Sequence, residues 1–156
     1  MPTTLAVSGN TRLAWSLSDP QSVVSFSGSS ESRTSRSITN GTGVGQANVA
    51  ASKSVTGTQA GFSLSLTGVT GSALGATQTA VISTVRELLV SVTTGPTGGF
   101  VTLTHPGISG VRVGVGGQFH LADYESGITG GTLSFSATVT GTYGVDLTAV
   151  GLGSYS

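Results

Sequence analysis

The 156-residue chain contains no cysteine, so neither a disulfide nor a thiolate metal site contributes to its fold. Charged residues are also scarce, at 8% of the chain against roughly 25% in an average globular protein. Six basic and six acidic residues cancel, so the chain lacks the net positive charge typical of DNA- and RNA-binding proteins. The same balance disfavours binding to an anionic membrane surface.

Long hydrophobic runs are absent as well. Because no stretch reaches about 18 apolar residues, the sequence predicts no transmembrane helix. The first ten residues, "MPTTLAVSGN", have neither the basic nor the apolar segment of a secretory signal. We therefore expect a protein that is made in the cytoplasm and leaves the cell by lysis or within a larger particle.

The chain is instead rich in small and hydroxylated residues, with 24 Ser, 24 Thr and 25 Gly. Valine, isoleucine and threonine occur throughout in alternating patterns, which favours a folded β protein over a disordered chain. A surface with so few charges is poorly protected against self-association. We therefore expect part of this surface to be covered by neighbours in an assembly.

Alternating apolar residues predict eight to ten short strands separated by Gly-rich turns. The predicted strands are 11–18, 22–26, 61–68, 87–93, 100–105, 111–115, 118–122, 132–140 and 141–151, with a polar edge strand over 32–38. Residues 69–80 resemble a loop, and 81–86 fit either a helical turn or the start of a strand. The predicted fold is all-β, an antiparallel β-sandwich of jelly-roll type with an extended N-terminal arm. Residues 1–50 would form N-terminal strands and an inter-subunit polar arm, and residues 51–156 the sandwich body.

Two glycines interrupt the stretch "VRVGVGGQFHLADYE". Gly116-Gly117 predicts a positive φ between two strands, as in a hairpin or a bulge. Phe119 and Leu121 then return to the core, and His120 points outward. Near the end of the chain, the tight Gly141-Thr142 junction predicts a terminal hairpin.

The same stretch raises the question of a metal site, because Asp123 and Glu125 follow His120 closely. A metal site needs several ligands that converge from a fixed scaffold, and only one imidazole is nearby. A turn in which Asp123 caps backbone N–H groups explains the pattern better. We predict no metal ligand here.

A catalytic triad is also disfavoured, although His105, His120, Asp19, Asp123 and Asp146 supply the residue types. No Gly-x-Ser-x-Gly elbow is present to activate a serine, and His105 precedes Pro106 in what reads as a turn. As for a glycosidase pair, exposed ladder positions explain Glu87 and Asp146. The sequence predicts no catalytic residue and no enzyme.

The segment "NGTGVGQAN" has glycines at 41, 43 and 45. This spacing differs from the dinucleotide fingerprint, and neither a P-loop lysine nor a helix follows. Flexible backbone explains the glycines better, and we predict no cofactor. Asn40 also begins a glycosylation sequon, which reads as chance without a signal peptide. Arg33, Arg36 and Lys53 read as parts of a polar arm that makes salt bridges between subunits.

The order of these segments resembles a group of small β-rich structural proteins of tailed bacteriophages and prophages. The resemblance rests on "TRLAWSLSDP", "SITNGTGVGQAN", "GFSLSLTGVTGSALGATQTAVISTVRELLVSV", "VRVGVGGQFHLAD" and "GVDLTAVG", and it covers most of the chain. It implies a virion component, such as a capsid decoration protein or a head or tail accessory protein. It carries over no catalytic residue, and it does not extend to "SESRTSRS".

We therefore expect a non-enzymatic virion protein, assembled in the host cytoplasm, that forms a homo-oligomer such as a trimer and binds the major capsid protein or another virion protein. We expect no direct contact with nucleic acid or membrane. A phage tail or head-fibre component and a carbohydrate-binding adhesive module are the alternatives, although Trp15, Tyr124, Tyr143 and Tyr155 define no stacking platform. The residues expected at subunit contacts are Leu5, Leu13, Trp15, Arg33, Arg36, Asn40 and Gln46.

Overall fold

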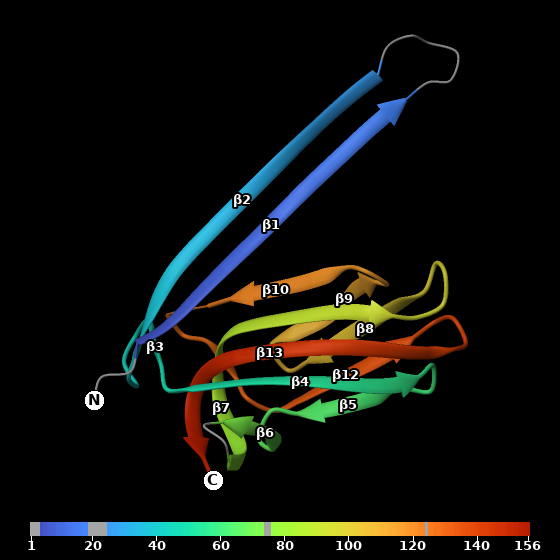
Figure 1. The fold of residues 1–156 in the computed structure, drawn as a ribbon. Helices are drawn as coiled ribbons and strands as arrows, with labels where there is room; N and C mark the ends of the chain where they lie inside the picture. Colours follow the sequence, from blue (N-terminus) through green and yellow to red (C-terminus); the bar gives the residue numbers. More distant parts are fainter. Residues whose placement is uncertain (1–3, 19–24, 74–75, 124) are drawn as a thin grey trace. The chain divides into compact units, whose positions relative to one another are not determined.

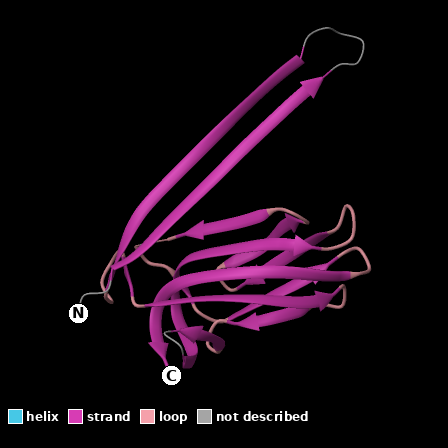
Figure 2. Cartoon of the chain, in the orientation of Figure 1, coloured by secondary structure: helices cyan, strands magenta, loops and turns pink. Residues whose placement is uncertain are grey.

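A computed structural model describes residues 4–18, 25–73, 76–123 and 125–156. Within these ranges the regular structure is entirely strand, as Figure 2 shows, and the strands pair in antiparallel fashion. The predicted all-β, antiparallel class is confirmed. The described part of the chain contains no helix that is long and apolar enough to cross a membrane.

Contacts divide the chain into two units, Met1–Thr39 and Asn40–Ser156. The first unit holds a two-stranded ribbon of β1 (Thr4–Ser18) and β2 (Ser25–Asn40), which pair over fifteen positions from Thr4↔Thr39 to Ser18↔Ser25. Alternate positions of β1 carry apolar residues, and the register places Leu17 opposite Phe26. A strand with this pattern gathers its apolar residues on one face.

The second unit, which we call the body, contains two sheets (Figure 1). The first sheet has the order β10-β7-β13-β4, with β6 and β11 also paired to β7, and the second has the order β5-β12-β8-β9. The strands of these two sheets are β4 (Val49–Thr58), β5 (Phe62–Ser65), β6 (Val69–Ala73), β7 (Ala76–Thr94), β8 (Phe100–His105), β9 (Ile108–Gly114), β10 (Gln118–Ala122), β11 (Ile128–Thr129), β12 (Thr132–Ala137) and β13 (Thr142–Tyr155). The short β3 (Gln46–Ala47) belongs to neither sheet and follows β1 and β2 in the strand order β1-β2-β3. From β4 onward, the chain passes repeatedly from one sheet to the other.

One apolar cluster joins the two sheets, an arrangement consistent with a β-sandwich. Inward residues of β7 and β13 in the first sheet cluster with those of β8 and β12 in the second. Phe62 and Phe135 stack with their ring centroids 5.0 Å apart. The largest side chains that are buried almost completely are Tyr143, Phe135, Leu66, Ile82, Leu88, Leu103, Leu133 and Leu147.

Most inward faces match the sequence pattern. Tyr143, Val145, Leu147 and Ala149 are all buried, as the alternation in residues 141–151 predicts. The alternation in β8 is confirmed as well, since its valine and leucine are buried and the neighbouring threonines are less so. The strand predicted over 132–140 is too long, because β12 ends at Ala137 and the Val139 side chain beyond it is exposed.

The largest corrections concern β6 and β7. The residues 69–80, predicted as a loop, contain β6 and the beginning of β7, which pair from Val69↔Ala80 to Ala73↔Ala76. The helical alternative for 81–86 is also wrong, because β7 runs as one strand from Ala76 to Thr94. Cross-strand pairing decides both segments, and a local reading of the sequence does not detect it.

The predicted terminal hairpin is wrong. β12 pairs with β5 and β8, whereas β13 pairs with β4 and β7, so residues 138–141 cross from one sheet to the other. A tight glycine junction permits such a crossing as readily as a hairpin.

The Gly116-Gly117 junction has the same role. The predicted positive φ is confirmed at Gly116, where φ is 81°. However, β9 pairs with β8 and β10 pairs with β7, so the junction is a corner between sheets rather than a hairpin or a bulge. The Gly116 N–H donates to the Val92 carbonyl at 2.7 Å, which anchors the corner to β7.

Candidate functional site

The imidazole of His120 is the centre of the stretch singled out in the sequence. As predicted, Phe119 and Leu121 pack against the core, and His120 lies on the opposite face of β10. Its Nε2 lies 2.7 Å from Glu87 Oε1, and the two side chains are 35% and 9% exposed. The partner of His120 is therefore a carboxylate 33 residues earlier in the chain, not one of the nearby acids.

Asp123 behaves as a capping residue, as predicted. Its Oδ1 accepts a hydrogen bond from the Ser126 N–H at 3.1 Å. The backbone N–H groups of Ser126 and Gly127 lower the pKa of the Asp123 carboxyl, because they stabilise its ionised form. Within the described ranges, no three His, Cys, Asp or Glu side chains come together as a metal site.

Glu87 and its neighbour Arg86 depart from the prediction of exposed ladder positions. Both are buried, at 7% and 6% exposure. The ladder between β7 and β13 shifts register between Val150 and Gly151, so the two-residue alternation fails here. Arg86 Nε and Nη1 have no hydrogen-bond partner among the described residues. Asp146 is exposed on β13, as predicted.

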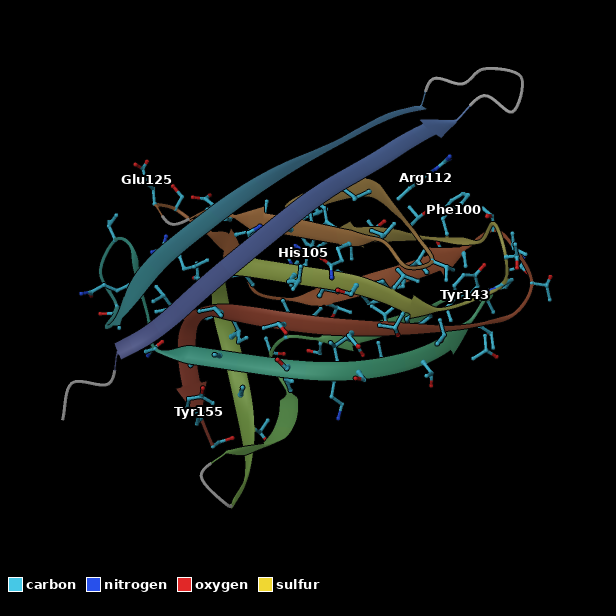
Figure 3. The ribbon with its side chains drawn as sticks, turned by 45° about the horizontal axis from the view of Figure 1, so that its top comes forward. Phe100, His105, Arg112, Glu125, Tyr143 and Tyr155 are labelled. Atoms are coloured by element: carbon cyan, nitrogen blue, oxygen red, sulfur yellow. The ribbon has the colours of Figure 1, made fainter. Side chains whose placement is uncertain are left out.

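His105 is the last residue of β8, and its side chain is buried (Figure 3). It is 4% exposed, and its Nδ1 accepts a hydrogen bond from the Gly107 N–H at 3.2 Å across the His105–Ile108 turn. Burial lowers the pKa of the imidazole, because the charged form is poorly solvated there. His105 therefore supports the turn, as its position before Pro106 predicted.

No hydrogen bond joins a serine to either histidine in the part of the chain that the structure describes. Asp146 accepts instead from Ser54 Oγ at 2.6 Å. Asp19 and Tyr124 lie outside the described residues. The described groups thus form hydrogen bonds within turns and between paired strands.

The glycine-rich segment is organised by its own glutamine. The Oε1 of Gln46 accepts from the Gly43 N–H at 2.8 Å, and the Gln46 N–H donates to the Gly43 carbonyl at 3.1 Å. A loop closed in this way uses a donor that a phosphate would otherwise require. The amide of Gln46, predicted at a subunit contact, therefore binds within its own loop.

Asn48 is a structural residue that the sequence reasoning missed. Its Nδ2 donates to the Gly153 carbonyl at 2.8 Å, and its Oδ1 accepts from the Gly153 N–H at 2.9 Å. The side chain thus copies a strand backbone and continues the β4–β13 ladder by one step. The signal was present in "GQAN", but only the distant pairing partner gives it meaning.

The remaining residues predicted at subunit contacts are distributed over the ribbon. Leu5, Leu13 and Trp15 lie in β1, and Arg33, Arg36 and Asn40 lie in β2. Lys53, grouped with the two arginines in the sequence, lies on β4 of the body.

The most regular exposed surface is the outer face of the β5-β12-β8-β9 sheet, which we call the hydroxyl face. The register aligns Ser63, Ser134 and Thr104 in one row, and Ser136, Thr102 and Arg112 in the next. At one end, the Arg112 guanidinium lies 4.8 Å from the centroid of the Phe100 ring (Figure 3).

Comparison with protein-family models, curated proteins and solved structures found no match for this chain.

Proposed function

We propose that the protein is a non-enzymatic structural component of a bacteriophage particle, in which the β1–β2 ribbon joins neighbouring copies. The observation that carries the proposal is the ribbon itself, fifteen paired positions that form a unit apart from the body. A two-stranded ribbon is marginally stable in water and gains stability when another surface covers its apolar face. In a homo-oligomer, the adjacent copy supplies that surface.

The chemistry of the body supports a structural role. Asp123, His105 and Gln46 are hydrogen-bonded within turns, and Asn48 continues a strand ladder. The low charge of the chain lowers the cost of removing water between subunits. We place the protein on the capsid as a decoration or stabilising protein that contacts the major capsid protein, with the tail or a head fibre as the alternative position.

The strand connectivity supports a jelly-roll-like design with an extended N-terminal arm. Successive strands from β4 to β13 pass repeatedly between the two sheets, and the steps β6–β7, β8–β9 and β10–β11 remain within one sheet. Jelly-roll domains use such crossings to build a double-sheet wall. A wall with an added arm is well suited to a shell.

The first experiment measures association. Sedimentation equilibrium of the full-length protein should give a discrete oligomer, and Trp15→Ser in the ribbon should shift it toward monomer. The control is Thr97→Ser, in an exposed turn of the body. A full-length protein that stays monomeric at every concentration contradicts the proposal.

The second experiment addresses location. Mass spectrometry of purified particles from the host that carries the gene should detect the protein in a fixed ratio to the major capsid protein. Finding it only in the soluble fraction of the lysate contradicts a place in the virion.

A carbohydrate-binding module is the second candidate, and the hydroxyl face favours it. Rows of serine and threonine hydroxyls can bind sugar hydroxyls, and Phe100 with Arg112 lies at one end of the rows. A glycan array would give a saturable signal that Phe100→Ala abolishes. A signal that Phe100→Ala leaves unchanged, or no signal, rejects this candidate.

A further inference from the structure

Strand β4 ends its sheet with one edge unpaired. Its ladder neighbour is β13, and the strand order of the body places no further strand beyond it within the described residues. With ten residues, it is longer than the other end strands β5, β9 and β10. An edge of this length offers a row of backbone donors and acceptors to another chain.

One hydroxyl shows which backbone groups face this edge. Tyr155 Oη accepts from the Ala50 N–H and donates to the Ala50 carbonyl, each at 2.9 Å. The N–H and C=O groups of one strand residue point to the same side of the strand. Both groups of Ala50 bind the Tyr155 hydroxyl instead of the β13 backbone, so they point away from the β13 ladder. In an antiparallel ladder this direction repeats at every second residue. The N–H and C=O groups of Ser52, Ser54 and Thr56 therefore point outward too, beyond the stretch that Tyr155 caps.

The side chains beside this edge are already fixed on the outer face of the sheet. Ser52 Oγ lies 2.9 Å from Thr148 Oγ1, and Ser54 Oγ donates to Asp146 at 2.6 Å. The opposite face of the strand carries Ala51 and Val55, which pack against the apolar cluster, with the exposed Lys53 between them. An incoming strand that is polar on one face and mostly apolar on the other would continue both faces.

Strand β1 has this composition. Alternate positions are apolar, at Leu5, Val7, Leu13, Trp15 and Leu17, and the positions between them are small or polar. Its one charged residue, Arg12, falls in the polar set, and the exposed acid on the outer face near this end of the sheet is Asp146, on β13 opposite Ser54 of β4. In the strand order β1 neighbours β2 alone, so the part of the chain that the structure describes gives its second edge no partner.

Charge supports the same pairing. The first unit, Met1–Thr39, holds Arg12, Arg33 and Arg36 against Asp19 and Glu31, which is three positive and two negative charges, or +1. The body holds three basic residues and four acidic residues, or −1; they are Lys53, Arg86 and Arg112, and Glu87, Asp123, Glu125 and Asp146. A ribbon from another copy thus approaches a body of opposite sign.

We propose that β1 of a second copy adds to the free edge of β4, beside Ser52, Ser54 and Thr56. The polar positions of the added strand would continue the outer face of the sheet, and its apolar positions would continue the core face. Each copy donates β1 at one place and accepts at another, so the contact is heterologous, and a discrete oligomer requires the chain of contacts to close into a ring. This assignment rests on the proposed function, since it names the surface that the ribbon would occupy.

Proline at Thr56 tests the edge, because it removes one outward N–H while the ladder to β13 keeps its bonds. Thr56→Ala is the matched control, since it removes the same hydroxyl and keeps the N–H. We expect Thr56→Pro to weaken association by about tenfold or more in sedimentation equilibrium, and Thr56→Ala to leave it within about twofold. Thermal unfolding by circular dichroism checks that both variants fold. If Thr56→Pro does not fold, the pair Ser52→Pro and Ser52→Ala takes its place.

Cysteine pairs give a second and independent readout, because the chain has no cysteine of its own. Protein with Thr56→Cys is mixed with protein carrying Ser8→Cys, Asn10→Cys or Ala14→Cys, and the mixture is oxidised. Disulfide-linked dimers that form in the mixture for one of the β1 positions, in preference to the others, support the assignment. A chain that carries Thr56→Cys together with one of the β1 cysteines tests the opposite case. If a disulfide forms within this single chain, independently of dilution, β1 reaches β4 of its own copy and the assignment is overturned.

The two proposals fail in different ways. A full-length protein that does not associate overturns the proposed function. A protein that associates, with Thr56→Pro equal to Thr56→Ala and no dimer from any cysteine pair, keeps the proposed function and overturns β4 as the receiving edge.

Discussion

The body and the ribbon are built from the same kinds of residue and reach stability by different routes. In the body, β7 and β13 each pair on both sides, and their inward residues share one core with the second sheet. In the ribbon, β1 and β2 pair with each other over fifteen positions and belong to neither of the two sheets that share the core. Strand pairing alone therefore does not build a core; a second packed layer does.

Core truncation gives the largest expected contrast. Leu103→Ala removes a fully buried side chain between the sheets and should lower the free energy of unfolding by about 2–5 kcal/mol. The matched change in the ribbon, Leu13→Ala, should leave the unfolding of the monomer unchanged and weaken association instead. Urea unfolding at several protein concentrations separates the two effects. Equal losses in dilute monomer would remove the distinction between the two units.

The Asn48 side chain tests how firmly the body closes at the start of β4. Asn48→Ala removes both bonds to Gly153 and should cost about 1–3 kcal/mol of unfolding free energy. Asn10→Ala in β1 is the control and should not change the unfolding of the monomer. Hydrogen exchange should show faster exchange at Gly153 in Asn48→Ala, and unchanged exchange there would contradict the assigned role.

The pH dependence of the body should follow His105. Burial lowers the pKa of this imidazole below its usual 6.5, so the unfolded chain takes up the proton more readily than the folded protein. The group has no effect on stability well above pH 6.5. As the pH falls below 6.5, stability decreases by at most about 1.4 kcal/mol per pH unit until the folded pKa is reached.

Urea unfolding between pH 8 and pH 5 measures this slope. The variant His105→Gln should lose it, because the titrating group is gone. The window lies above the range in which Asp123 contributes, since the lowered pKa of that carboxyl means its stabilisation is lost as the pH falls below about 3.8. A slope that persists in His105→Gln would assign it to another group.

The smallest effect concerns the corner between β9 and β10. Gly116→Ala places a Cβ at a φ of 81° and should cost about 1 kcal/mol. Gly114, two residues earlier, has no positive φ, and a Cβ there would meet open space. Gly114→Ala should therefore be near neutral in the same thermal melts, and equal costs would reject the backbone explanation.

Much of the body could be predicted from residue alternation. The inward rows in β8, β12 and β13 were readable because each strand has a buried and an exposed face. The hairpin of β6 and β7 was not readable, since alanine, glycine and threonine give no alternation there and the pairing decides the structure. The sequence likewise did not predict that the chain crosses to the other sheet at Gly116 and Gly141, because a glycine fits a hairpin and a crossing equally well.

The candidate site shows the same limit. The capping by Asp123 depends on residues three positions apart, and the sequence predicted it correctly. The contact of Glu87 with His120 depends on the register of β7 against β10 and on a bulge beside β13, neither of which has a local signal. Contacts within a turn are therefore within reach of sequence reasoning, and contacts between strands are not.

The position of β13 has a consequence for synthesis. Thr142–Tyr155 lies between β4 and β7 and pairs with both, so among the described strands β4 has no ladder partner in the larger sheet until residues 142–155 exist. During translation, the earlier strands would therefore have part of their apolar surface exposed. A stop codon before residue 142 would thus leave β4 and β7 without the strand that pairs with both.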